Sequence, residues 1–259
     1  MPIQSARCPE PYRLPLADRD DRYADRAEAG RALAALLLPY RGGRAIVLAL
    51  PPGGVAAGAE LAHSLRLPLD VLIAREFVIR PYPTIVAGAL SEGGGLCVNA
   101  ALLRLPGASL AGLWSEARRA YRENEAQAAA YRSGRALPSL GRRPVILVDD
   151  GLSNGLLQLA ALAALRHYHP QRCIVATPFG TPAALGHIAR MADELVTLTH
   201  GTAEHQDAIT HWQQALGDDD AAALLHRWQM DAAILDIARA TRNSAAISMS
   251  YSGGNEPQR

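Results

Sequence analysis

Two adjacent carboxylates, Asp149 and Asp150, are the residues of this chain best placed to do chemistry. They follow a mostly β-branched apolar run at 145–148, which predicts a strand buried on both faces of a parallel sheet. Glycine, serine and asparagine at 151–155 predict a tight turn into a helix. Ligands bind at the carboxyl edge of such sheets, where the free N–H groups of a following helix attract phosphate. The order therefore predicts a pocket for a phosphorylated sugar.

A second turn is expected on the same edge of the sheet. The Pro-Pro-Gly-Gly sequence at 51–54 follows an apolar run at 44–50 and precedes a predicted helix at 54–65 and a strand at 69–74. This strand-helix-strand order predicts a βαβ unit, whose two strands are parallel. Two turns at the carboxyl ends of parallel strands would line one cleft.

The rest of the chain keeps alternating between helix and strand patterns. We expect helices at 24–38, 109–132, 156–168 and 181–191, strands at 172–177 and 194–198, and a further helix from Ala221 capped within Asp218 to Asp220. Such alternation predicts an α/β fold with a doubly wound, mainly parallel sheet. The expected organisation is an N-terminal arm (1–20), a main domain (21–225) and a C-terminal helix with a polar tail (226–259).

Several segments, in order, resemble one bacterial branch of the type I phosphoribosyltransferases. They are DRAEAGRALAALL at 25–37, LALPPGGVAAGAELA at 48–62, LDVLIARE at 69–76 and AGALSEGG at 87–94, together with the acidic strand and turn at 144–158. The resemblance implies transfer of a phosphoribosyl group from phosphoribosyl pyrophosphate, with Mg²⁺ holding the pyrophosphate. Another sugar phosphate is the alternative ligand.

The resemblance also assigns roles to residues. Asp149 and Asp150 would hold the ribose hydroxyls. The 5'-phosphate would bind to Gly151, Leu152, Ser153, Asn154, Gly155, Leu156 and Leu157, and the pyrophosphate to Pro51, Pro52, Gly53 and Gly54. Glycines 53 and 54 could equally serve only close packing.

Residues 76–99 are expected to form a small flap over the substrate, as in the resembled family. Two prolines around Tyr82 and three glycines at 93–95 suit a mobile hairpin, although an ordinary surface hairpin fits the composition equally well. Arg75 is a candidate catalytic residue, and Arg80 and Tyr82 are candidate flap contacts. Arg75 or Arg80 would supply positive charge to the cleft.

The chain departs from the family pattern at four positions. Asn154 and Leu157 replace two threonines of the phosphate loop, Pro52 replaces an arginine, and Glu76 replaces a basic residue. A hydrogen bond to a charged group contributes about 1.5–3 kcal/mol, so two lost hydroxyls would weaken phosphate binding roughly 10²-fold to 10⁴-fold. The alternative function is therefore a regulatory protein that binds a nucleotide, a sugar phosphate or a partner protein without catalysis. Ser153 stands where the purine-salvage branch has an aspartate, so the acceptor is not expected to be a purine.

Composition limits the partners. The chain of 259 residues has 26 basic residues, all arginine, against 25 acidic ones, and this balance argues against a nucleic-acid-coating surface. No apolar run approaches the roughly 20 residues of a membrane span, so a soluble, cytoplasmic protein with no membrane partner is expected. Association into a homo-oligomer is left open.

Cysteine and histidine patterns predict no metal site or disulfide. Cys8, Cys97 and Cys173 are widely spaced and odd in number, which fits free thiols in a reducing compartment. The histidines at 200, 205 and 211 do not share a helical face, and no cysteine lies near them. We therefore expect no protein-held zinc ion.

Overall fold

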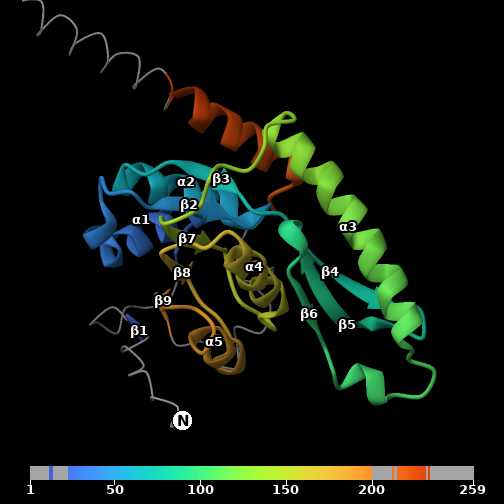
Figure 1. The fold of residues 1–259 in the computed structure, drawn as a ribbon. Coiled ribbons are helices and arrows are strands. Elements are labelled where there is room, and N and C mark those ends of the chain that lie inside the picture. The colour runs from blue at the N-terminus through green and yellow to red at the C-terminus, as the bar shows by residue number, and fades with distance from the viewer. Residues whose placement is uncertain (1–11, 14–22, 200–211, 213–214, 232, 234–259) are drawn as a thin grey trace, which may run out of the picture.

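A six-stranded parallel sheet forms the centre of the computed structural model (Figure 1). The structure describes residues 12–13, 23–199, 212, 215–231 and 233. The strand order is β1-β9-β8-β7-β2-β3, and every pairing in this sheet is parallel. Its strands are β1 (Tyr12–Arg13), β2 (Ile46–Ala49), β3 (Leu69–Val71), β7 (Pro144–Val148), β8 (Arg172–Thr177) and β9 (Glu194–Thr197). The predicted α/β class with a mainly parallel sheet is confirmed.

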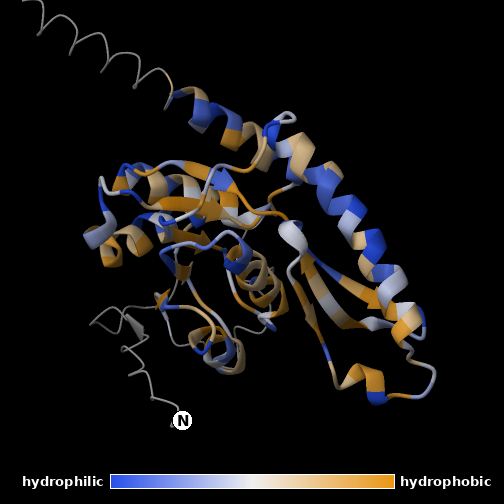
Figure 2. Cartoon of the chain, in the orientation of Figure 1, coloured by the Kyte–Doolittle hydropathy of each residue, from blue (hydrophilic) through white to orange (hydrophobic). Residues whose placement is uncertain are grey.

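Helices cover both faces of this sheet. One face packs against α1 (Arg26–Leu36) and α2 (Gly53–Leu65), and the other against α4 (Leu156–His167) and α5 (Pro182–Ala189) (Figure 1). The central strands are buried and almost wholly apolar, as Figure 2 shows by their orange colour. Because both faces are covered, these strands read as continuous apolar runs, which is why they were recognisable in the sequence.

A second sheet forms the region predicted as a flap. It is three-stranded and antiparallel, with β4 (Ala74–Ile79), β5 (Tyr82–Ser91) and β6 (Leu96–Val98) in that order. One face packs on α3 (Leu110–Arg132) through a separate apolar cluster that includes Phe77 and Leu113. The other side lies along α4, where an added Cβ on Gly95 would come within 2.1 Å of the Ala160 carbonyl oxygen. The flap sheet is therefore held between two helices.

The expected element boundaries lie within two residues of the observed ones, except at two elements. The strand expected over 69–74 is divided, because β3 ends at Val71 in the large sheet and β4 starts at Ala74 in the small one. The last described helix runs over 218–231 and starts at Asp218 instead of Ala221. Asp218 lies inside it and accepts hydrogen bonds from Tyr131 Oη and Gln127 Nε2 of α3, at 2.7 and 2.9 Å.

The remaining short elements are three 3₁₀ turns, η1 (Leu38–Tyr40), η2 (Glu92–Gly94) and η3 (Leu102–Arg104). Of the expected N-terminal arm, Tyr12–Arg13 pair with β9, and its other residues lie outside the described part of the chain. Residues 243–259 of the expected polar tail lie outside it as well. None of the described helices combines the length and the hydropathy that a membrane span requires.

Candidate functional site

The two predicted turns emerge side by side from neighbouring strands. β2 and β7 are paired in register, with Ala49 opposite Val148, and the Leu50 N–H donates to the Val148 carbonyl at 2.9 Å. The Pro-Pro-Gly-Gly turn and the acidic turn therefore start at the same level of the sheet. The peptide bond between Pro51 and Pro52 is cis.

Glycines 53 and 54 let the start of α2 touch the acidic turn. A Cβ added to Gly53 would lie 2.0 Å from Oδ2 of Asp150, and one added to Gly54 would lie 2.6 Å from the Val148 carbonyl oxygen. Neither distance leaves room for a side chain. Close packing is thus one role of both glycines, while contact with a pyrophosphate stays a prediction.

Asp149 is buried at the end of β7. Its Oδ1 accepts the backbone N–H of Asp150 at 2.8 Å, and its Oδ2 accepts a hydrogen bond from the side-chain amide of Gln158. Burial raises the pKa of Asp149 well above its ordinary value, and the negative charge of Asp150 raises it further. This carboxyl group consequently holds a proton more readily than an ordinary aspartate.

Asp150 is more exposed and has a cationic partner. Nε of Arg26, the first residue of α1, lies 2.7 Å from its Oδ2, and the two side chains are only 14% and 16% exposed. The indole Nε1 of Trp212 donates to the Asp150 carbonyl at 3.0 Å. The Arg26 guanidinium also lies over the Trp212 ring, 5.1 Å from its centroid. A cavity of about 380 Å³ borders Arg26 and Trp212 on the side of Ala56.

The loop at 151–157 leads from Asp150 into α4. Gly155, at φ 77°, caps the helix in the left-handed region that favours glycine. Two N–H groups of the loop are already used: Leu152 donates to the Phe179 carbonyl at 3.0 Å, and Leu156 donates to Oδ1 of Asn154 at 2.8 Å. Asn154 therefore occupies one of the helix N-terminal donors that a phosphate would use.

The flap reaches this loop through Glu76. Its Oε1 accepts a hydrogen bond from Nδ2 of Asn154 at 2.8 Å. Glu76 stands where the family usually has a basic residue, and Asn154 where it usually has a threonine. The two replacements are thus hydrogen-bonded to each other.

The other flap candidates lie elsewhere. Arg75 bonds to α3, with Nη2 3.1 Å from Gln127 Oε1 and Nε 3.5 Å from Glu123 Oε2. The Tyr82 hydroxyl donates to the Pro106 carbonyl at 2.6 Å, and Arg80 is exposed in the turn between β4 and β5. The structure does not bring Arg75 and Tyr82 to the acidic turn in this conformation.

Three site residues were missed by sequence reasoning: Arg26, Gln158 and Trp212. Arg26 lies in one of the segments that carry the family resemblance, and Gln158 ends the stretch that begins with the acidic strand. Both positions could have been singled out as polar residues at the starts of predicted helices. Trp212 had no such signal, because it lies far from any recognisable motif.

The described residues contain no group of three or more histidine, cysteine or acidic side chains that could hold a metal ion. Cys97 and Cys173 are free thiols. The three histidines at 200, 205 and 211 lie outside the part of the chain that the structure describes.

Comparison with known proteins identifies relatives. A crystal structure of TT1426 from Thermus thermophilus is 32% identical, with a TM-score of 0.65, over 80% of this chain and 99% of that one. The protein named "Putative phosphoribosyl transferase Rv0571c" from Mycobacterium tuberculosis is 34% identical over 176 residues, as is its counterpart from a second strain of that organism. The match covers 68% of this chain but only 40% of each of these curated relatives.

No family model matches the sequence. The extended similarity to these relatives nevertheless agrees with the motifs, the parallel sheet and the paired turns described above. On this evidence the chain belongs to the type I phosphoribosyltransferase family.

Proposed function

We propose that this protein transfers a 5-phosphoribosyl group from phosphoribosyl pyrophosphate to a nucleophilic acceptor. The observation that carries the proposal is the contact between the acidic turn and the Pro-Pro-Gly-Gly turn, where Asp150 lies directly against Gly53. The contact supports the proposal because a ribose site on the acidic turn and a pyrophosphate site on the Pro-Pro-Gly-Gly turn would then adjoin each other. In the reaction, the bond from the anomeric carbon to the pyrophosphate oxygen breaks and its electron pair leaves with pyrophosphate. The acceptor bonds to that carbon from the opposite side and releases its proton to water.

The two carboxylates would bind the ribose hydroxyls in different ways. The raised pKa of Asp149 lets it hold a proton and donate to a hydroxyl oxygen. Asp150, paired with Arg26, would accept a hydrogen bond from a hydroxyl. Arg26 would also place positive charge near the leaving pyrophosphate, the electrostatic contribution that Pro52 cannot make.

Magnesium would enter with the substrate. Mg²⁺ is commonly bound through one or two carboxylates together with substrate phosphates. Asp150 would provide one such carboxylate and hold a water ligand of the ion, and no protein cage occurs among the described residues. The ion would neutralise the charge that develops on the departing pyrophosphate.

Isothermal titration of the purified full chain with phosphoribosyl pyrophosphate and Mg²⁺ tests this proposal. Micromolar binding that Asp149→Asn/Asp150→Asn abolishes is expected. The matched control is Asp219→Asn/Asp220→Asn, another adjacent acidic pair, which is exposed on the last helix and should leave binding unchanged. No binding up to millimolar ligand would contradict the proposal.

A second candidate function, binding of a nucleotide or sugar phosphate without transfer, is favoured by the bond between Glu76 and Asn154. It predicts saturable binding with no pyrophosphate released across a panel of amine and heterocyclic acceptors. Enzymatic release of pyrophosphate with any acceptor would rule this candidate out.

A further inference from the structure

We propose that Glu76 is an internal gate on the phosphate loop at 151–157. Its carboxylate holds Asn154 and repels a phosphate dianion, so the loop binds phosphate only when Glu76 turns away. This inference rests on the proposed function, because it concerns the 5'-phosphate of the same ligand.

The gate is a chain of two hydrogen bonds. Asn154 donates from Nδ2 to Glu76 Oε1 at 2.8 Å and accepts the Leu156 N–H on Oδ1, also at 2.8 Å. Both ends of the amide are thus occupied. Leu156 is the first residue of α4, so its N–H is among the donors to which an anion at the helix start would bind.

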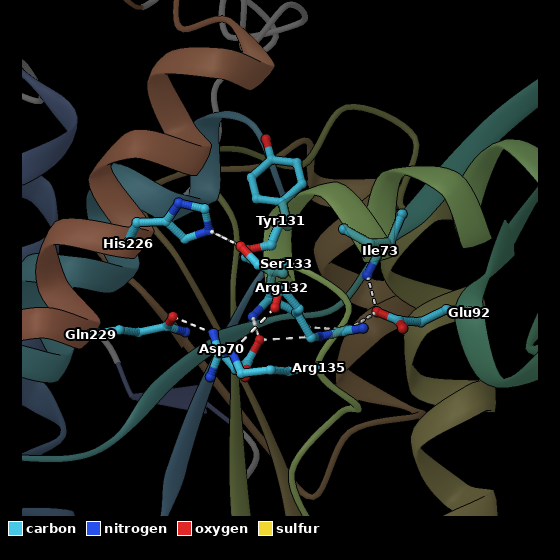
Figure 3. A network of polar contacts seen from close by, with 10 residues as sticks. Asp70, Ile73, Glu92, Tyr131, Arg132, Ser133, Arg135, His226 and Gln229 are labelled. Carbon is cyan, nitrogen blue, oxygen red and sulfur yellow. Dashed lines mark hydrogen bonds and ion pairs between the residues drawn. The ribbon is translucent and has the colours of Figure 1, made fainter. Parts of the chain in front are cut away.

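The strand that carries Glu76 starts beside a buried ionic network at the root of the flap (Figure 3). Arg132, at the end of α3, lies between the carboxylates of Asp70 and Glu92, with Nε 3.2 Å from Asp70 Oδ1. Glu92 also accepts the Ile73 N–H at 2.6 Å. Ile73 stands three residues before Glu76, so the backbone that carries Glu76 is anchored close by.

Strand geometry then turns Glu76 toward the loop. Side chains alternate across a strand, and the neighbours Arg75 and Phe77 both contact the α3 side of the flap sheet. Glu76 consequently projects from the opposite face, where α4 and its preceding loop lie.

Charge gives the expected size of the effect. A phosphate monoester carries about −1.5 to −2 charges near neutral pH, and exposed charges a few ångströms apart interact through a high effective dielectric constant. Removal of the Glu76 charge should therefore tighten phosphate binding roughly 10-fold to 30-fold at low salt. The gain should shrink at high salt, because ions screen exposed charges.

The experiment titrates ribose 5-phosphate into the wild type, Glu76→Gln and Glu76→Ala, because this ligand engages the loop without a pyrophosphate. Glu76→Gln removes the charge and can keep the hydrogen bond, whereas Glu76→Ala removes both. Glu125→Gln, an exposed residue of α3, is the control for net charge. Thermal denaturation of each variant checks that the fold is intact.

Tighter binding by both Glu76 variants, and not by Glu125→Gln, would support the gate. Unchanged affinity for ribose 5-phosphate in the Glu76 variants would overturn the gate. The proposed function would still stand if the wild type binds phosphoribosyl pyrophosphate and Asp149→Asn/Asp150→Asn does not. An equal gain in Glu125→Gln would also overturn the gate, since the effect would then be one of net charge. Failure of every variant to bind either ligand would overturn both proposals.

Discussion

Arg26 and Asp150 stand 124 residues apart in the sequence and form an ion pair of 2.7 Å in the fold. The pair joins the first turn of α1 to the end of β7. It is largely shielded from solvent, which distinguishes it from ion pairs on the protein surface. Such shielding makes the loss of one partner costly, because the other charge is left without compensation.

We expect Arg26→Ala to lower the free energy of unfolding by about 1–3 kcal/mol. This value lies between the cost of losing one partner of an exposed ion pair and that of a fully buried one. Chemical denaturation measures this value. The matched control is Arg31→Ala on the same helix, whose pair with Glu60 is 53% and 37% exposed and should contribute less than about 0.5 kcal/mol. Equal losses in the two variants would contradict the expected role of shielding.

The raised pKa of Asp149 predicts a pH-dependent stability. A carboxyl group whose pKa is higher in the folded state binds more protons when folded, so its contribution is fully present below its unfolded pKa and is lost as the pH rises through the folded pKa. Asp149→Asn removes this penalty and should stabilise the protein above about pH 5, with a gain that grows by up to about 1.4 kcal/mol per pH unit until the folded pKa is reached. Thermal denaturation from pH 4 to pH 8 should show the stabilities of the wild type and Asp149→Asn converging at the acidic end. A difference in stability that stays constant with pH would refute the raised pKa of Asp149.

Substitutions at the two turn glycines should have separable effects. Gly53→Ala meets the Asp150 side chain, which can move, so we expect lost ligand binding with a stability loss of about 1 kcal/mol. Gly54→Ala meets the backbone carbonyl of Val148, which cannot move so easily, and should cost about 2–3 kcal/mol. Gly186→Ala within α5 meets nothing closer than Arg190 Nη1 at 3.8 Å and should stabilise by up to about 1 kcal/mol. Titration and denaturation of the three variants together would reveal any departure from this order.

Arg132 should be the most sensitive of the charged residues at the flap root. Arg132→Met leaves Asp70 and Glu92 buried without their cation, and we expect a loss of about 3–5 kcal/mol. Arg119→Met, on the exposed face of the same helix, should not change stability measurably. If Arg132→Met fails to fold, the triple variant Asp70→Asn/Glu92→Gln/Arg132→Met should recover part of the stability, and no recovery would count against a purely electrostatic role.

The parallel core could be predicted well from the sequence, because the patterns that indicate its strands and helices are local. The apolar run before Asp149 and the Ala- and Leu-rich run of α4 each lie within one element, and both elements were placed within one residue of their ends. The strand expected over 69–74 was wrong in extent, because the chain changes sheets at Leu72 and Ile73, which are as apolar as a continuing strand would be.

The site was only partly predictable for a related reason. Adjacent carboxylates followed by a turn can be recognised from neighbouring residues, whereas the partners Arg26 and Trp212 reach Asp150 only through tertiary packing. The side of the flap on which Arg75 lies depends on strand register, and no local pattern specifies that register.

The buried network around Arg132 has a kinetic consequence. Because the root of β4 is anchored, admission of a ligand past Glu76 needs only rotation of exposed side chains, which takes picoseconds to nanoseconds, and not the slower displacement of a whole domain. Binding of phosphate at the loop would then depend on the fraction of molecules in which the Glu76 side chain points away from Asn154. The observed association rate would scale with that fraction.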